Sequence, residues 1–455
     1  MRKLTSEEIA RAAGGRLIRG GGRETATEVV IDSRAAGSGK VFFAIKGQVH
    51  DAHKFIPDVV KSGCRIVVVS DESKAPEGCD VILTDDTLKA LQNLAAYYMR
   101  TLDVKTVAVT GSVGKTSTRD LIYAGLSSKY RTARSRKNFN NQFGVPLTVL
   151  AFDGTEEAAV IEMGMEHKGE IHRLADIVRP HIGVITNIGI SHMENLGSRE
   201  GIRDAKLEIT DFFTEENTLV IDGADDMLKD LKSDSYGIVR VGSCPDAAVS
   251  VDGITDKGAL GVDVKLTAFG EETDVHLKIP GAHNGINLAL AVAACSLMGV
   301  DPSDAAKAME KAELTGNRLK VSDAGGITVI DDSYNAAPAS MKSAVKTLMA
   351  TAGKRRIAVF AGMAELGENS RALHEEVGEF AAEEGVDLLI TIGENAEGIK
   401  AGAERKNIKS AVHFEKRDDI YPEIEKIFAP GDVILIKGSR VMELEKLTEK
   451  IHEVM

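Results

Sequence analysis

The chain has 455 residues, which is too long for a single hydrophobic core, so about three domains are expected. Hydrophobic residues make up 43% and charged residues 27% of the sequence, which is typical of globular proteins and excludes a disordered chain. The net charge of -13 argues against broad binding to nucleic acids or anionic membranes, because both require a basic face. An anionic small substrate could still bind where local positive groups hold it.

The cysteines and the apolar segments indicate a protein of a reducing compartment. The cysteines show no paired spacing of the metal-binding or redox type, so each is expected to be a small buried hydrophobic residue without a disulfide. No apolar segment approaches the length that spans a membrane. We therefore expect a cytoplasmic protein. The cysteines are Cys64, Cys79, Cys244 and Cys295.

Residues 1–102 are predicted to form a small α/β unit. The chain opens with an amphipathic helix whose start carries a capping-box signature, Thr5 followed by Glu8. Apolar residues also share one face of a later helix, among them Leu88 and Leu91. The other predicted elements of this unit are strands at 28–32, 41–45, 65–70 and 81–84 and the helix at 87–100.

Residues 103–314 are predicted to form a doubly wound, mainly parallel sheet, because strands and helices alternate along this unit. Between residues 248 and 279, strict alternation of apolar and polar residues instead predicts an antiparallel ribbon inserted in the sheet or packed at its edge. A helix over 285–298 follows. The predicted parallel strands lie at 106–110, 158–163, 182–186 and 219–222.

Residues 315–455 are predicted to form a second nucleotide-fold-like unit that has no phosphate loop. The whole chain is therefore expected to be an α/β protein of three domains, with short linkers near residues 103 and 315 about which the domains could hinge. The predicted elements of the last unit are strands at 327–331, 356–360, 387–392, 411–414 and 432–436 and helices at 341–350, 370–384, 418–428 and 443–451.

The segment TVAVTGSVGKTST predicts a buried strand, a phosphate-binding loop and a helix. Gly111 and Gly114 allow a tight turn whose backbone N–H groups bind phosphate oxygens at the start of the helix. Lys115 would reach the β- and γ-phosphates, and the Thr116 hydroxyl could ligate Mg²⁺. The full phosphate-loop pattern has glycine where this chain has Val109, so a chance Gly-Lys-Thr turn is the alternative.

Three further residues could carry chemistry. Glu162 ends a predicted strand at the same edge as the loop, where a carboxylate can hold Mg²⁺, or it is a solvated strand-end residue. His192 follows the run IGVITNIGISH and could be a metal ligand or catalytic group, or a satisfied structural histidine. Lys206 fits an ordinary surface lysine of a helix. The alternative is a lysine of lowered pKa whose neutral amine reacts with CO₂ to form a metal-bridging carbamate.

Two later segments could contact a nucleotide or a substrate. In PGAHNGIN, Asn284 and Asn287 offer paired donors and acceptors to an adenine, or Asn284 simply caps the following helix. In VIDDSYNAAPASM, Asp332 could accept hydrogen bonds from ribose hydroxyls while Tyr334 faces substrate, or the aspartate could be a helix cap. Arg318 could reach a phosphate across the gap between units, or form an ordinary surface pair.

Together these motifs resemble the Mur ligase family across essentially the whole chain. The loop of that family reads TGxxGKT, so Val109 is no departure from it. Within the family, the chain is most similar to the members that add D-alanyl-D-alanine to a UDP-linked N-acetylmuramoyl tripeptide. The motifs are, in chain order, TGSVGKTST, KNFNNQFGVP, EMG, NIGISH with GSRE and AK, PGAHNGIN, IDDSYNAAP, GMAELG and KGSR.

The resemblance implies an ATP-dependent, ADP-forming amide ligase of peptidoglycan precursor synthesis, a monomer with small-molecule partners only. It implies an N-terminal domain for the UDP end of the substrate, a central ATPase domain, and a C-terminal Rossmann-like domain that closes over both. The substrate carboxylate would attack the γ-phosphate of ATP, and the D-alanyl-D-alanine amine would displace phosphate from the resulting acyl phosphate. Two Mg²⁺ ions would offset the repulsion between these anions, one at Thr116 and Glu162, the other at His192 and a carbamylated Lys206.

The same resemblance implies a role for individual residues. Lys115, His192 and Lys206 would be catalytic. The ATP-binding positions would be Thr110, Gly111, Ser112, Val113, Gly114, Lys115, Thr116, Ser117, Asn138, Asn284, Asn287, Arg318 and Asp332. The substrate-binding positions would be Ser33, Arg34, Asp51, His53, Asn140, Tyr334 and Asn335, of which the first four would lie on the uridine side.

Two positions depart from the usual pattern of the family. Ala52 stands where glycine is usual, and Ala337 stands where asparagine is common, which affects contacts to uridine and dipeptide rather than the ATP chemistry. The chain has no Asn-Pro-Arg-like segment, which marks the neighbouring type that adds a single amino acid. That type, a folylpolyglutamate-synthase-like ligase, and a nucleotide-gated binding protein are the alternative functions.

Overall fold

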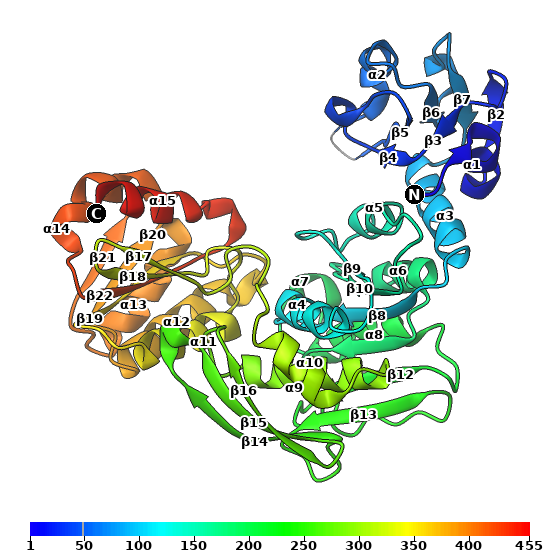
Figure 1. Ribbon diagram of the computed structural model, residues 1–455. Coiled ribbons are helices and arrows are strands. Elements are labelled where there is room, and N and C mark those ends of the chain that lie inside the picture. The colour runs from blue at the N-terminus through cyan, green and yellow to red at the C-terminus, as the bar shows by residue number, and fades with distance from the viewer. Residues whose placement is uncertain (48–49) are drawn as a thin grey trace.

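The computed structural model describes residues 1–47 and 50–455 and consists of three α/β lobes (Figure 1). Each lobe has its own sheet, of five, nine and six strands in chain order. The N-terminal lobe, drawn in blue, stands apart, whereas the central and C-terminal lobes lie next to each other. The fold therefore confirms the predicted α/β architecture of three domains.

The N-terminal lobe is a small, mostly parallel sheet with helices packed on it. Its elements are β1 (Leu4–Thr5), α1 (Ser6–Ala13), β2 (Arg16–Arg19), β3 (Thr25–Ala26), β4 (Glu28–Val30), β5 (Lys40–Phe43), α2 (Ile56–Lys61), β6 (Ile66–Val69), β7 (Asp80–Leu83) and α3 (Thr87–Arg100). The sheet order is β2-β7-β6-β5-β4, with β2 antiparallel to its neighbour. Helix α1 begins with the predicted capping box between Thr5 and Glu8.

The central lobe contains the long sheet that carries the phosphate loop. Its strands are β8 (Lys105–Thr110), β9 (Thr132–Arg134), β10 (Ala158–Glu162), β11 (Ile182–Ile185), β12 (Thr218–Asp222), β13 (Gly237–Gly242), β14 (Val249–Asp256), β15 (Val262–Ala268) and β16 (Glu271–Leu277). Its helices are α4 (Lys115–Leu126), α5 (Gly144–Val149), α6 (Glu170–Val178), α7 (Met193–Leu196), α8 (Arg199–Leu207), α9 (Asn284–Leu297) and α10 (Pro302–Met309).

Helices cover both faces of this sheet, which explains why its central parallel strands β8, β10 and β11 are largely apolar and buried. Val107 and Val109 of β8 belong to the core on the side of α4 and α9, whereas Ala108 belongs to the core on the side of α6. The strand lies between β10 and β11, so the loop that follows β8 emerges at the middle of the sheet. In an open α/β sheet, this carboxyl edge is where ligands bind.

The predicted antiparallel ribbon is present at one edge of the central sheet. Strands β14, β15 and β16 pair antiparallel in succession, and β14 joins the parallel strands through β13. Along β15 the side chains alternate between buried and less buried positions, as the sequence pattern predicted.

The C-terminal lobe is a six-stranded sheet in the order β17-β18-β22-β19-β20-β21, in which only β17 is antiparallel. Its elements are β17 (Lys320–Ala324), β18 (Ile327–Asp331), α11 (Pro338–Ala350), β19 (Arg355–Ala361), α12 (Ser370–Glu383), β20 (Leu388–Ile392), α13 (Glu397–Arg405), β21 (Ala411–Phe414), α14 (Ile424–Ile427), β22 (Asp432–Lys437) and α15 (Glu445–Val454). The predicted helix at 418–428 was mostly wrong. A 3-10 helix containing Pro422 replaces most of it, because proline donates no backbone hydrogen bond.

Specific contacts join the lobes. The Tyr98 hydroxyl of α3 donates to the carbonyl of Phe152 at 2.7 Å, which fixes α3 to the central lobe. The Nδ1 atom of His283 lies 2.7 Å from the hydroxyl oxygen of Ser343, across the boundary between the central and C-terminal lobes. We propose domain boundaries near residues 103 and 315, in the short segments that precede β8 and β17.

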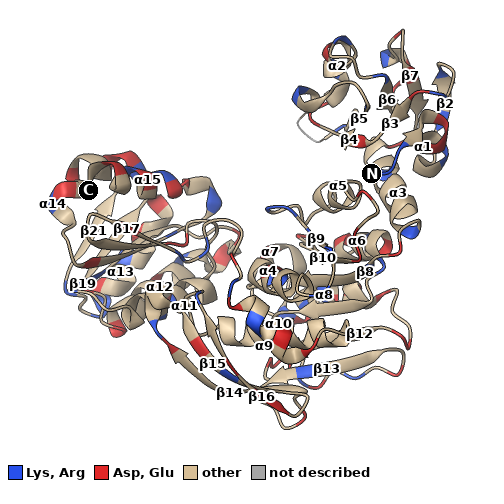
Figure 2. Ribbon diagram, viewed as in Figure 1, with Lys and Arg blue, Asp and Glu red and all other residues tan. Residues whose placement is uncertain are grey.

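Charged residues of both signs are interleaved on the outer helices, for example along α15 (Figure 2). In the described part of the chain, no helix is both long and apolar enough to cross a membrane.

Candidate active site

The phosphate loop has the backbone shape that the sequence predicted. Gly111 and Gly114 have φ angles of 147° and 86°, in the region that favours glycine. A Cβ at position 111 would lie 1.9 Å from the Thr186 hydroxyl, and one at 114 would lie 2.8 Å from Asn287 Oδ1. Any larger residue at either position would therefore clash as well as strain the backbone, which argues against a chance turn.

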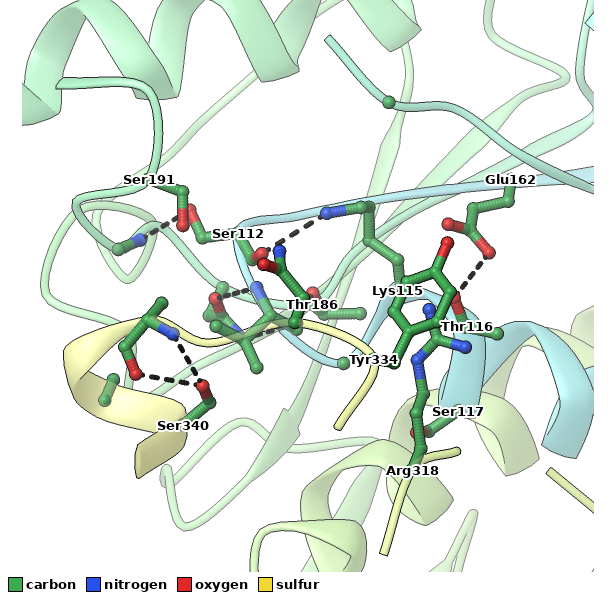
Figure 3. Close-up of a pocket in the computed structure, with 18 of the residues that line it drawn as sticks. Ser112, Lys115, Thr116, Ser117, Glu162, Thr186, Ser191, Arg318, Tyr334 and Ser340 are labelled. Carbon is green, nitrogen blue, oxygen red and sulfur yellow. Dashed lines mark hydrogen bonds between the residues drawn. The ribbon is translucent and has the colours of Figure 1, made fainter. Parts of the chain in front are cut away.

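Residues that follow β11 hold this loop from one side (Figure 3). The amide of Asn187 accepts from the Val113 N–H at 3.0 Å and donates to the Val113 carbonyl at 2.9 Å. The Thr186 hydroxyl donates to the same carbonyl at 2.6 Å, and the Ser112 hydroxyl accepts from Gly189 N–H at 2.8 Å. The sequence prediction missed Thr186 and Asn187, although Thr186 ends the predicted strand 182–186 and Asn187 follows it directly.

Lys115 is the first residue of α4 and its side chain curls back over the loop. Its ammonium donates to the carbonyls of Gly111 at 2.8 Å and Ser112 at 3.2 Å (Figure 3). Burial lowers the pKa of Lys115, and the negative charge of Glu162 opposes that shift. The lysine is thus held where phosphates bound to the loop would be within reach of its charge.

Glu162 receives hydrogen bonds from several segments. The Thr116 hydroxyl donates to its Oε2 at 2.8 Å (Figure 3). Asn140 Nδ2 donates to its Oε1 at 2.8 Å. Arg119 Nη1 also donates to Oε2, at 3.2 Å. Glu162 is only 2% exposed, so the alternative of a solvated strand-end residue was wrong. Oxygens of Thr116 and Glu162 lie together here, and oxygen donors are the ligands that suit Mg²⁺.

The sequence did not lead us to predict Arg119 as a site residue. It connects Glu162 to the rest of the central lobe. Its side chain is completely buried and also donates two hydrogen bonds to Asp120, at 2.7 and 2.9 Å. Asp120 in turn accepts from Arg134 at 2.8 Å and from the Thr315 N–H at 2.6 Å. A signal was present, because Arg119 follows Thr116 by three residues and so lies on the same face of α4.

His192 and Lys206 face the same cavity as the loop. His192 precedes α7 with a left-handed backbone, φ 64°, and lies several residues beyond the end of β11 rather than directly at it. Burial first, and then the charges of Lys115 and Lys206, lower the pKa of His192 to about 4, so the imidazole is neutral at pH 7. The carboxylate of Glu365 lies 2.9 Å from its Nδ1.

Lys206 lies on α8 and is 2% exposed, so its interpretation as a surface lysine was wrong. Burial and the charge of Lys115 lower the pKa of Lys206 well below its ordinary value. Such a shift favours the neutral amine, which can accept a metal or react with an electrophile such as CO₂.

The two asparagines of PGAHNGIN are buried at the start of α9. Asn284 Nδ2 donates to the Pro280 carbonyl at 2.7 Å, and Asn287 Nδ2 donates to Asn284 Oδ1 at 2.9 Å. The capping alternative for Asn284 was wrong, because His283 holds the cap position and no side-chain cap bond forms there. Both asparagines line the cavity next to Gly114.

The C-terminal lobe contributes the opposite wall. The Arg318 guanidinium stacks 3.8 Å from the centre of the Tyr334 ring (Figure 3). Lys437 donates to Asp332 Oδ2 at 2.6 Å and to the Asn335 carbonyl at 2.8 Å. The helix-cap alternative for Asp332 was wrong, because α11 begins after Ala337. Lys437 was not predicted as a site residue, although it belongs to the KGSR motif.

Most of the predicted site residues thus line a single cavity of about 740 Å³ between the central and C-terminal lobes. Asn138 lies at an exposed position of this lining, whereas Thr110 and Gly111 are buried where β8 ends. The predicted residues that line the cavity are Ser112, Val113, Gly114, Lys115, Thr116, Ser117, Asn138, Asn140, Glu162, His192, Lys206, Asn284, Asn287, Arg318, Asp332, Tyr334 and Asn335.

The predicted uridine-side residues lie in the N-terminal lobe, away from this cavity (Figure 1). Ser33 and the exposed Arg34 lie in a short 3-10 helix, where Arg34 forms a two-pronged pair with Asp32. His53 is 4% exposed. Its Nδ1 contacts Asp51 at 2.6 Å and its Nε2 accepts from Ser70 N–H at 3.0 Å. Both ring nitrogens of His53 thus have partners within the protein, and its contact with substrate stays a prediction.

Comparisons with known proteins agree with this geometry. Residues 109–295 match the model of the Mur ligase middle domain, and residues 317–440 match that of the Mur ligase glutamate ligase domain. The chain is 36% identical to the UDP-N-acetylmuramoyl-tripeptide–D-alanyl-D-alanine ligase of Bacillus subtilis, over 100% of this chain and 99% of that protein. The chain belongs to the Mur ligase family.

Solved structures of Mur ligases share the arrangement of all three lobes. A crystal structure of MurF from Acinetobacter baumannii superimposes with a TM-score of 0.91 at 29% identity, covering 100% of this chain and 99% of that one. MurF from Thermotoga maritima in complex with ADP superimposes with a TM-score of 0.83 at 26% identity, covering 94% and 97% of the two chains.

Proposed function

We propose that this Mur ligase joins D-alanyl-D-alanine to a UDP-N-acetylmuramoyl tripeptide, with conversion of ATP to ADP and phosphate, in cytoplasmic peptidoglycan precursor synthesis. The observation that carries the proposal is the convergence of Lys115, Glu162, His192 and Lys206 on one cavity, in a chain similar along its full length to an enzyme of that name. The structure of a similar MurF with ADP supports the assignment of ATP to the phosphate loop.

The residues present fit two Mg²⁺ ions. The Thr116 hydroxyl and the Glu162 carboxylate form one set of hard oxygen donors. His192 and Lys206 form the second, provided that the neutral Lys206 amine carries a carbamate, which would supply the missing anionic oxygens. When bound, these ions would neutralise charge between the substrate carboxylate and the triphosphate.

The residues of the chain then account for the first half of the reaction. The N–H groups of the loop and the Lys115 ammonium would hold the β- and γ-phosphates. A substrate carboxylate oxygen forms a bond to the γ-phosphorus while the bond from that phosphorus to the β,γ-bridging oxygen breaks, which yields an acyl phosphate and ADP. Lys115 would stabilise the charge that develops on the transferred group.

In the second half, the amine attacks the acyl carbonyl and inorganic phosphate leaves with the electron pair of the broken C–O bond. The C-terminal lobe would seat the dipeptide and adenosine near Arg318, Tyr334 and Asp332, since these line the wall opposite the loop. Enclosure between the lobes would exclude water, which would otherwise hydrolyse the acyl phosphate. We propose that Ser33 and Arg34 receive the uridine end and that the enzyme is a monomer.

The test is phosphate release from ATP by the purified chain, with the UDP-linked tripeptide and D-alanyl-D-alanine supplied together and singly. Sustained release together with a joined pentapeptide product is expected only when both are present. Equal turnover with a single amino acid in place of the dipeptide would favour the neighbouring ligase type. Release of one ADP per protein molecule, without product, would favour a nucleotide-gated binding protein and overturn the proposal.

A further inference from the structure

Glu365 belongs to the GMAELG motif, which the proposed function leaves without a role. The motif follows β19, and its start is anchored within the C-terminal lobe. The Met363 N–H donates to the buried His374 Nε2 at 2.8 Å, and the Gly362 carbonyl accepts from Ser439 N–H at 3.1 Å. Glu365 itself has a left-handed backbone, φ 61°, which is unusual for a residue with a side chain. The loop therefore holds Glu365 in a specific, strained direction.

The side chain of Glu365 extends across the lobe boundary to His192. Glu365 Oε2 lies 2.9 Å from His192 Nδ1, although Glu365 belongs to the C-terminal lobe and His192 to the central lobe. Within the described residues, this buried Nδ1 has no aligned hydrogen-bond partner, so a small rotation toward Glu365 would satisfy it. Gly367 of the same loop lies beside Glu194 of α7, so the loop also approaches the helix that His192 begins.

A carboxylate this close to Nδ1 of His192 is the kind of partner that a metal-binding histidine uses. Such histidines usually donate the N–H of one ring nitrogen to a carboxylate, which fixes the tautomer and leaves the other nitrogen free for the metal. With Nδ1–H directed to Glu365, the Nε2 lone pair of His192 would be available to the cavity that Lys206 also lines. The side chain of Glu365 is 55% exposed, so its carboxylate can move away from His192 if the lobes separate.

We propose that Glu365 is a positioning residue that the C-terminal lobe supplies to His192 when the lobes close, so that the second metal site is complete only in the closed enzyme. The inference rests on the proposed function, because that function assigns His192 to the metal. It adds a physical link between lobe closure and metal binding. ATP chemistry would then begin only when the lobe that seats the amine substrate is in place.

The test measures Mn²⁺ binding to the ADP-loaded enzyme by electron paramagnetic resonance titration, which does not depend on turnover. In Glu365→Ala, the affinity of the weaker Mn²⁺ site is expected to fall about 10- to 100-fold, while the site at Glu162 keeps its affinity. Glu365→Gln retains an acceptor oxygen and is expected to lose less. The matched control is Glu368→Gln, an exposed glutamate of the same loop, which should bind Mn²⁺ as the wild type does.

A second measurement distinguishes positioning from a general structural effect. In ¹⁵N-histidine-labelled enzyme, the His192 resonance should report a proton on Nδ1 in the wild type and a mixture of tautomers in Glu365→Ala. Unchanged Mn²⁺ affinity and an unchanged tautomer in that variant would overturn the inference even if the wild type is an active ligase. Absence of ligase activity in the wild type would instead overturn the proposed function, so the two failures are separable.

Discussion

Burial, reinforced by the positive charge of Lys115, lowers the pKa of Lys206 well below its ordinary value. The two lysines come from α4 and α8, yet they line one cavity. The lowered pKa favours the neutral amine, which is a nucleophile toward CO₂. The resulting carbamate would be an anionic ligand in place of a second cation next to Lys115. The chemistry proposed for Lys206 thus follows from its location beside Lys115.

Lys206→Ala is expected to lower kcat at least about 100-fold, because the second metal would lose a ligand where charge develops. Added acetate or another short carboxylate should restore part of the activity by occupying the vacated space. Phosphate release with both substrates checks this. Arg203→Ala, on a more exposed face of the same helix, is the control and should retain activity. Normal turnover by Lys206→Ala would refute the carbamate.

Lys115→Ala is expected to reduce ATP turnover at least about 100-fold, since its ammonium is the cation positioned over the loop. The loss should be mainly in kcat, because the loop N–H groups would still bind the nucleotide. Steady-state kinetics with a parallel measurement of ADP affinity separates the two effects. If the ADP affinity fell at least about 100-fold while kcat stayed unchanged, Lys115 would serve nucleotide binding rather than phosphoryl transfer.

Asp120→Asn is expected to destabilise the protein by about 3 kcal/mol, because the buried Arg119 and the partly buried Arg134 would lose their shared anionic partner. Urea unfolding followed at the central lobe gives the free energy. Asp176→Asn removes an exposed carboxylate that also pairs with arginines, and it should cost less than about 1 kcal/mol. Similar values for the two variants would mean that the buried network contributes little to stability.

His374 should make the C-terminal lobe sensitive to acid. Burial lowers the pKa of His374 below its ordinary value of 6.5, although the Ser370 carbonyl opposes the shift. The unfolded chain therefore binds the proton more readily, so the stability contributed by the neutral ring is present above about pH 6.5 and is lost as pH falls. Thermal unfolding of wild type and His374→Gln at pH 7.5 and 5.5 should show a smaller difference at pH 5.5. A constant difference would exclude this titration.

Local sequence patterns determined a large part of the fold, because they depend on neighbouring residues alone. The glycine positions and the Lys-Thr pair predicted the phosphate loop. Alternation with period 2 predicted the ribbon of β14 to β16, and the capping box predicted the start of α1. The position of Glu162 at a strand end also followed, since parallel strands bring their carboxyl ends to one edge. Pro422 was underestimated as a helix breaker, which explains the error at 418–428.

What only the tertiary structure decided is which polar side chains are removed from water and which distant segments meet. Helical spacing places Arg119 on the same face as Thr116, but no periodicity shows that Arg119 or Lys206 is buried. Long cationic side chains are usually solvated, and their burial depends on neighbours far along the chain. The satisfied ring of His53 and the approach of Glu365 to His192 likewise depend on packing between segments or lobes. The sequence by itself therefore determined the chemistry available to this protein, and the packing of the lobes decided which groups share a cavity, because desolvation and proximity exist only in the folded state.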